Sequence, residues 1–137
     1  NAIINHILNR KIEYCNNNGI SIKCMVCGEL KGVSDYDIHI ILENLLDNAI
    51  EAALKAVDKR ISVDIYSDEQ AMVIKISNTT EENVLKNNPE MNTTKKDNSY
   101  HGYGIKNVSE LVKKNNGTIE YIQLGVYIVQ CRVLLML

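Results

Sequence analysis

The chain has 137 residues, of which 45% are hydrophobic and 23% are charged, and its formal net charge is −2. This length and composition are typical of one globular domain that is large enough to bury a core. No basic run is long enough to suggest nucleic-acid binding, and no apolar run reaches the roughly 18 residues of a membrane-spanning helix.

The first quarter of the chain predicts a helix followed by a strand. Apolar side chains recur near helical spacing over residues 1–17, and Gly19 follows as a left-handed cap. Residues 20–26 alternate between apolar and polar side chains, which indicates a half-buried strand. The N-terminus lacks the features of a signal peptide, and the chain starts at Asn1 rather than at methionine. We therefore expect a fragment of a longer protein that begins inside a helix.

The middle of the chain predicts a long helix and two strands. Ser34 or Asp35 caps the helix, which runs to about Val57. Alternating apolar residues over 61–65 and 72–76 indicate strands that a hairpin-like turn connects.

From Asn78 to about His101 the sequence is polar and aperiodic, and it contains Pro89, the only proline. A loop of this length inside a regular domain is uncommon and tends to be a functional lid or disordered. Helical spacing resumes at Ile105 and continues to Lys114, and two further strands are predicted after it, over 118–124 and 126–137.

This order of elements predicts an α+β fold. We expect a two-layer α/β sandwich in which a mixed, mostly antiparallel sheet carries the helices on one face. A doubly wound parallel sheet would need more alternating strand–helix units. Residues 1–137 are expected to form a single domain.

Four cysteines include a C-x-x-C pair, Cys24 and Cys27. A zinc site usually needs a second pair, and a redox pair usually starts a helix. We favour reduced, partly buried cysteines, with metal or redox chemistry as the minor alternative.

The sequence NLLDNAIEAA, residues 44–53, carries the most informative pattern. Asn44, Asn48 and Glu51 fall at i, i+4 and i+7 and share one face of the predicted helix, apart from its apolar stripe. Asparagine is a mediocre helix former, so something other than helix stability favours it here. Oxygen donors in this arrangement suit a hydrated Mg²⁺ that a nucleotide carries.

Three further segments could contact a ligand. Gly102 and Gly104 open a predicted helix, where free N–H groups bind phosphate, although a bare turn is an equal alternative. Lys95 and Lys96 could reach phosphate oxygens, or could be a solvated pair of charges. Asn78 could pair with the amine edge of a ligand, or could simply start a turn.

Together these motifs resemble the ATP-binding domain of the GHKL superfamily, which includes histidine kinases, gyrase-type topoisomerases, certain chaperones and mismatch-repair ATPases. Residues 44–53 look like its N box, Asn78 occupies the position of its G1 box, and residues 101–108 look like its G2 box. The resemblance implies the Bergerat fold. More narrowly, residues 41–53, 93–96 and 101–108 resemble the Agr-type quorum-sensing sensor kinases of Gram-positive bacteria.

The resemblance also implies roles for single residues. Asn48 would coordinate Mg²⁺ that bridges the ATP phosphates. Asn44 stands where hydrolytic relatives carry the general base, and an amide cannot act as a base, which fits phosphate transfer to a histidine rather than to water. Asn78 matches an aspartate that accepts a hydrogen bond from adenine, although the glycines of the D-x-G-x-G pattern are absent.

The lid would comprise residues 79–100, and Gly102 and Gly104 would let it fold over the phosphates, which Lys95 or Lys96 would neutralise. The ATP site implied by the resemblance comprises Asn44, Asn48, Glu51, Asn78, Lys95, Lys96, Gly102, Tyr103, Gly104 and Ile105.

The implied function is that of the catalytic domain of a sensor histidine kinase in a two-component system. Such a domain transfers the γ-phosphate of ATP to a histidine in a domain that this chain lacks, so the fragment alone would turn ATP over little. Residues 1–17 would be the end of the preceding dimerisation helix. The implied partners are that phospho-acceptor domain and, through the full-length kinase, a response regulator. The parent would be a homodimer, anchored in the membrane, with this domain in the cytoplasm.

Three other interpretations remain. A hydrolytic member of the same superfamily conflicts with the amide at Asn44. A stand-alone anti-sigma-type kinase should begin with its own first strand. A degenerate module that keeps the fold but binds nucleotide weakly or not at all is favoured by the missing G1 glycines.

Overall fold

A computed structural model describes residues 1–81 and 99–137, and over 99–106 it gives the course of the backbone helix. Its helices and strands follow the predicted order. They are α1 (Ala2–Asn17), β1 (Ser21–Cys27), α2 (Asp35–Lys55), β2 (Arg60–Ser67), β3 (Ala71–Thr79), α4 (Ser99–Lys114), β4 (Thr118–Gly125) and β5 (Ile128–Met136).

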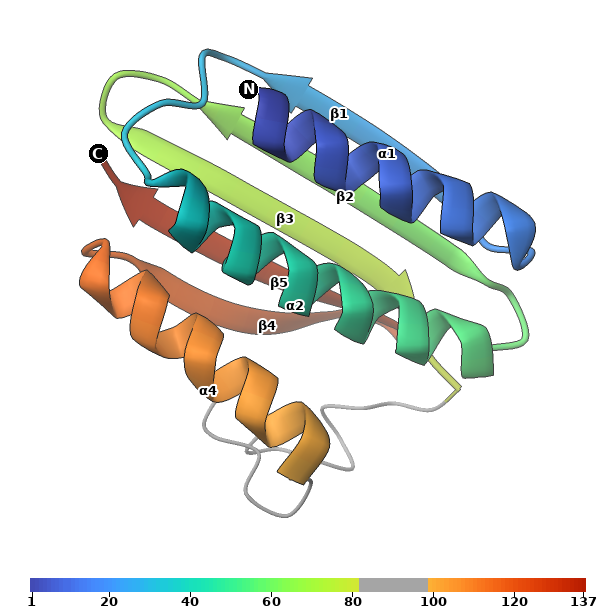
Figure 1. The fold of residues 1–137 in the computed structure, drawn as a ribbon. Coiled ribbons are helices and arrows are strands. Elements are labelled where there is room, and N and C mark those ends of the chain that lie inside the picture. Colours follow the sequence, from blue (N-terminus) through green and yellow to red (C-terminus); the bar gives the residue numbers. More distant parts are fainter. Residues whose placement is uncertain (82–98) are drawn as a thin grey trace.

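The strands form one five-stranded sheet in the order β1-β2-β3-β5-β4. β1 runs parallel to β2, and the other neighbours are antiparallel. Helices α1, α2 and α4 cover the same face of this sheet, with α2 between the other two (Figure 1). The predicted α+β fold, a two-layer sandwich with a mixed, mostly antiparallel sheet, is confirmed.

The core between the two layers is aliphatic, as expected for a chain without Phe or Trp. Every second residue of the central strands points into it, and α2 contributes the longest apolar stripe. The largest fully buried side chains include Ile4, Ile7, Ile38, Ile41, Leu42, Leu46, Ile65, Met72, Ile74, Ile76 and Leu135. Among the helices that the structure describes, none is long and apolar enough to cross a membrane.

The ends of the first two helices match the predictions. Gly19 has a φ of +72°, the left-handed conformation that ends α1. The hydroxyl of Ser34 accepts a hydrogen bond from the backbone N–H of Asp37 at 3.1 Å, so Ser34 rather than Asp35 is the N-cap of α2. α2 ends at Lys55, slightly before the predicted boundary at Val57.

The start of α4 differs from the prediction. The loop was expected to continue to about His101 and the helix to start near Ile105, but α4 begins at Ser99. Glycine inside a helix costs only about 1 kcal/mol relative to alanine, so the apolar spacing of the following turns extends the helix back across Gly102 and Gly104.

The C-x-x-C pair lies in β1, where residues three positions apart point to opposite faces. Cys24 lies on the helix-covered face, and burial raises the pKa of its thiol to about 11. Cys27 is exposed, and neither cysteine forms a disulfide. The two thiols therefore do not converge on one site.

A buried carboxylate connects the beginning of α2 to the end of α4. Asp37 is 2% exposed, and its Oδ2 accepts a hydrogen bond from Asn115 Nδ2 at 3.1 Å and pairs with Lys114 Nζ at 3.2 Å. The hydrogen bond from Asn115 is the largest of the effects that hold the pKa of Asp37 below its ordinary value of 3.8. This contact fixes the position of α4 beside α2.

We expect Asp37→Asn to lower the free energy of unfolding by roughly 1–3 kcal/mol, because the buried bonds to Asn115 and Lys114 weaken. The folded-state pKa of Asp37 is lowered, so its contribution is complete above the ordinary value of 3.8 and is lost as the pH falls through the folded-state pKa. Urea denaturation at neutral and acidic pH would measure both effects. Asp35→Asn, an exposed neighbour, is the control; equal losses in the two variants would contradict the assignment.

Candidate functional site

The polar triplet of α2 lies on one face of the helix, as predicted. Asn44, Asn48 and Glu51 are each half-buried. The sheet-facing stripe of the same helix is formed by Leu42, Leu45, Leu46, Ala49 and Ala53. The triplet lies outside this stripe and is thereby kept out of the core.

The side chain of Asn44 makes a hydrogen bond to its own helix, one turn earlier. Its Nδ2 donates to the backbone oxygen of Ile40 at 2.9 Å. A bond of this kind to the preceding turn contributes little to helix stability. It occupies the amide nitrogen and leaves the side-chain oxygen as the group that can accept from a ligand.

Asn78 lies near the end of β3, as expected. It is 8% exposed, and strand alternation places it on the helix-covered face with Ile74 and Ile76. Its Nδ2 donates to the backbone oxygen of Thr79 at 3.1 Å. The side-chain oxygen is therefore again the acceptor that a ligand amine could use.

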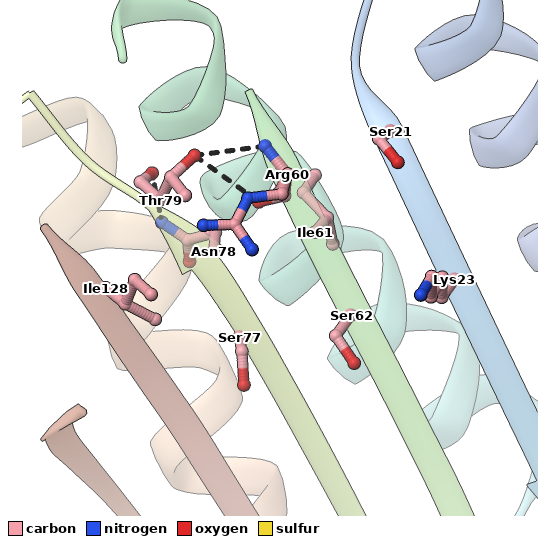
Figure 2. Close-up of a pocket in the computed structure, with 9 residues that line it drawn as sticks. All are labelled: Ser21, Lys23, Arg60, Ile61, Ser62, Ser77, Asn78, Thr79 and Ile128. Atoms are coloured by element: carbon pink, nitrogen blue, oxygen red, sulfur yellow. Dashed lines mark hydrogen bonds between the residues drawn. The ribbon is translucent and has the colours of Figure 1, made fainter. Parts of the chain in front are cut away.

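A hollow of about 330 Å³ extends across β1, β2, β3 and β5 next to Asn78, over the face of the sheet that the helices leave uncovered (Figure 2). Its lining consists of Ser21, Lys23, Arg60, Ile61, Ser62, Ser77, Asn78, Thr79 and Ile128. Thr79 Oγ1 accepts from Arg60 N at 3.1 Å and donates to Arg60 O at 3.4 Å, which connects β2 to the end of β3. These bonds fix the backbone that carries Asn78.

The predicted lid begins at this point. Thr79 is the last residue of β3, and the N–H of Thr80 donates to the backbone oxygen of Tyr127 at 2.8 Å. The chain therefore leaves the sheet after Thr80. Lys95 and Lys96 lie outside the described residues, so the structure does not place them.

The glycine segment lies in the first turns of α4, which begins a few residues before the two glycines that were expected to open it. Gly102, Tyr103, Gly104 and Ile105 all belong to these turns, where the structure gives the backbone alone. α4 packs against α2 on the side opposite α1 (Figure 1). The fold therefore places both β3 and the glycine-bearing helix against α2.

Sequence reasoning missed a second polar cluster on α2. A hollow of about 520 Å³ lies between α1 and α2 and is lined by Arg10, Lys11, Tyr14, Asp47, Ile50, Glu51 and Leu54. Lys11 and Asp47 form an ion pair there. The sequence feature that could have indicated this cluster is Lys11, a charged residue at a position of α1 where the helical spacing predicts an apolar one.

In the part of the chain that the structure describes, no group of three or more His, Cys, Asp and Glu side chains could hold a metal ion. The oxygen donors of the polar triplet of α2 are two neutral amides and one carboxylate. Such a set suits Mg²⁺ that arrives with phosphate oxygens and waters as its other ligands.

Comparison with known proteins identifies a family model that matches this chain and solved structures that share its fold. The family model described as a GHKL domain matches residues 33–132. The catalytic domain of the histidine kinase ThkA aligns with a TM-score of 0.77 and 18% identity over 99% of this chain and 92% of that one. A comparison with curated protein sequences finds no match.

Two further kinases share the fold. The Acinetobacter baumannii histidine kinase AdeS aligns with a TM-score of 0.73 and 15% identity over 98% of this chain, which spans 63% of the AdeS chain. The mycobacterial sensor histidine kinase MprB aligns with a TM-score of 0.70 and 14% identity over 97% of this chain and 95% of that one. The fold is thus the Bergerat fold of histidine kinase catalytic domains.

We expect Asn44→Ala to change the free energy of unfolding by no more than about 0.5 kcal/mol, because the better helix propensity of alanine offsets the lost bond to Ile40. Leu45→Ala, the adjacent buried residue, is the control and should lose roughly 2–5 kcal/mol. Urea denaturation would measure both. A loss above about 2 kcal/mol in Asn44→Ala would make Asn44 a structural residue rather than a ligand-binding one.

Proposed function

Because the chain belongs to the GHKL domain family, we propose that it is the ATP-binding catalytic domain of a sensor histidine kinase. The observation that carries the proposal is the polar face of α2. Two asparagines one turn apart, followed by Glu51, lie beside the apolar stripe of the continuous helix α2. The fold that contains this helix is shared with histidine kinase catalytic domains. Helix stability gives no reason for the two asparagines.

Asn48 would be the protein ligand of Mg²⁺. Its side chain is half-buried on α2 and can present one neutral oxygen. Mg²⁺ usually takes one or two protein ligands beside phosphate oxygens and waters, and when bound it supplies neutralisation of the phosphate charge. Glu51, one turn further along, would accept hydrogen bonds from the water shell of the ion.

Asn44 supports phosphate transfer rather than hydrolysis. A carboxamide cannot remove a proton from water, so this position would not activate a water molecule for attack on ATP. The phosphoryl group would pass instead to a histidine in another domain. Residues 1–17 would be the end of the dimerisation helix that belongs to that phospho-acceptor domain.

The remaining contacts complete the proposed site. The oxygen of Asn78 would accept a hydrogen bond from the amino group of adenine, without the charge of an aspartate. Lys95 or Lys96 would neutralise the phosphates from the lid, and the backbone of Gly102, Tyr103, Gly104 and Ile105 would approach them at the start of α4.

The narrower assignment rests on motif resemblance. We propose an Agr-type quorum-sensing kinase of a two-component system, with a response regulator as the partner of the full-length protein. The parent would be a homodimer that is anchored in a membrane and carries this domain on the cytoplasmic side.

One observation favours a second candidate, a degenerate module of the same fold with weak or no nucleotide binding. Counting from Asn78, the two glycines of the D-x-G-x-G pattern would fall at positions 80 and 82, where this chain carries Thr80 and Glu82. The nucleotide titration below separates the two functions.

We expect Mg-ATP, and an analogue that cannot be hydrolysed, to raise the melting temperature of the wild-type domain, because a ligand that binds only the native state stabilises it. In Asn48→Ala the shift should disappear while the melting temperature without nucleotide stays near that of wild type. Asn9→Ala, an exposed asparagine on α1, is the matched control and should keep the shift. Absence of a shift in the wild type at millimolar nucleotide would favour the degenerate module.

A second variant tests adenine recognition. We expect Asn78→Ala to weaken ATP binding about two- to tenfold, which is the net value of one hydrogen bond, and to remove any preference for ATP over GTP. Ser77→Ala, the preceding residue on the opposite face of β3, should keep that preference. Calorimetric titration with both nucleotides is the measurement, and an unchanged preference in Asn78→Ala would remove Asn78 from the adenine site.

A further inference from the structure

We propose that Lys11 is a positioning residue for the nucleotide site. Its ammonium group bridges two carboxylates of α2, Glu43 and Asp47, and each of these residues directly precedes one of the two site asparagines. The Lys11 bridge, defined as Lys11 with Glu43 and Asp47, would fix the rotation of α2 about its own axis. The inference rests on the function proposed above.

Lys11 occupies a position where packing favours an apolar residue. The buried stripe of α1 consists of Ile4, Ile7, Leu8, Lys11 and Cys15. Lys11 is 9% exposed. Burying an ammonium group costs solvation free energy that an apolar side chain of similar volume would avoid, so a buried ion pair is weak evidence for a role in stability. Its presence here is better explained by what it holds in place.

The contacts of Lys11 are short and divide between two acidic side chains. Its Nζ lies 2.7 Å from Glu43 Oε2 and 2.6 Å from Asp47 Oδ1. Arg10 also pairs with Glu43, but it is half-exposed and makes no recorded pair with Asp47. Lys11 is therefore the cation that joins both carboxylates.

Glu43 and Asp47 are one turn apart on α2, where like charges repel each other. The Lys11 ammonium turns this repulsion into attraction toward α1. Successive residues of a helix are about 100° apart around the axis. Holding Glu43 and Asp47 against α1 therefore sets the direction in which the next residues, Asn44 and Asn48, project.

Other contacts constrain this rotation less. On the sheet side, α2 packs through a broad aliphatic stripe that includes the small residues Ala49 and Ala53. Apolar contacts of this kind are not directional, so they do not fix the rotation of the helix as a charged contact does. On the α1 side, the hollow lined by Tyr14, Ile50 and Leu54 leaves the packing incomplete next to the bridge. The Lys11 bridge is thus the directional contact at the level of the N box.

The test compares Lys11→Met with Lys11→Arg. We expect Lys11→Met to weaken Mg-ATP binding about tenfold in calorimetric titration, with a smaller effect on metal-free ATP, because the amide that binds the metal is misdirected. Lys11→Arg keeps the charge and should restore most of the affinity. Arg10→Gln, which removes a cation that contacts only Glu43, is the control and should bind like the wild type.

A second readout does not depend on nucleotide. The side-chain amide resonances of Asn44 and Asn48 in a nitrogen–proton NMR spectrum should shift in Lys11→Met and return in Lys11→Arg. Asp47→Asn breaks the bridge from its exposed end, and it should reproduce the shift if Lys11→Met does not fold.

The outcomes are separable. Shifted amide resonances in Lys11→Met, together with a wild-type domain that fails to bind Mg-ATP, would support the positioning role and overturn the proposed function. Binding by wild type, with unchanged resonances and affinity in Lys11→Met and Asp47→Asn, would overturn the positioning role and leave the proposed function standing.

Discussion

The burial of one face of α2 against the sheet is the constraint on which the rest of the domain depends. Leu42, Leu45, Leu46, Ala49 and Ala53 fill the centre of the core, and α2 also contacts α1 on one side and α4 on the other. Asn44, Asn48 and Glu51 lie outside this buried stripe, so the hydrophobic effect that stabilises the fold also keeps the candidate site out of the core.

Much of this arrangement could be predicted because its signals are local and periodic. Helical spacing predicted α1 and α2, and strand alternation predicted β2 and β3, since each element turns one face to the same core. The start of α4 was missed because glycine's cost in a helix is small and neighbouring turns outweigh it. The partners of Lys11 were missed because Glu43 and Asp47 are distant in sequence, and no local pattern shows which cation meets which carboxylate.

The candidate site departs from its family in ways that affect affinity more than architecture. Asn78 lies near the end of the expected strand, but it is an amide where the family has a carboxylate, and Thr80 and Glu82 stand where the family has glycines. The backbone beside it is instead fixed by the bonds between Thr79 and Arg60. In the proposed site, Asn78 would retain a hydrogen-bond acceptor without the charge of an aspartate, so its bond to adenine would be weaker while the fold stays the same.

The hydrogen bond from Thr80 to Tyr127, next to the last pair of the β3–β5 ladder, has a consequence for how the domain can vary. The chain between these two residues is a closed loop that includes residues 81–98, α4 and β4. The entropy cost of closing a loop grows only with the logarithm of its length, so that even a doubling costs about 0.6 kcal/mol. Insertions or deletions between Thr80 and the start of α4 should therefore be nearly neutral for folding, which leaves the length and sequence of that segment free to follow the demands of the ligand.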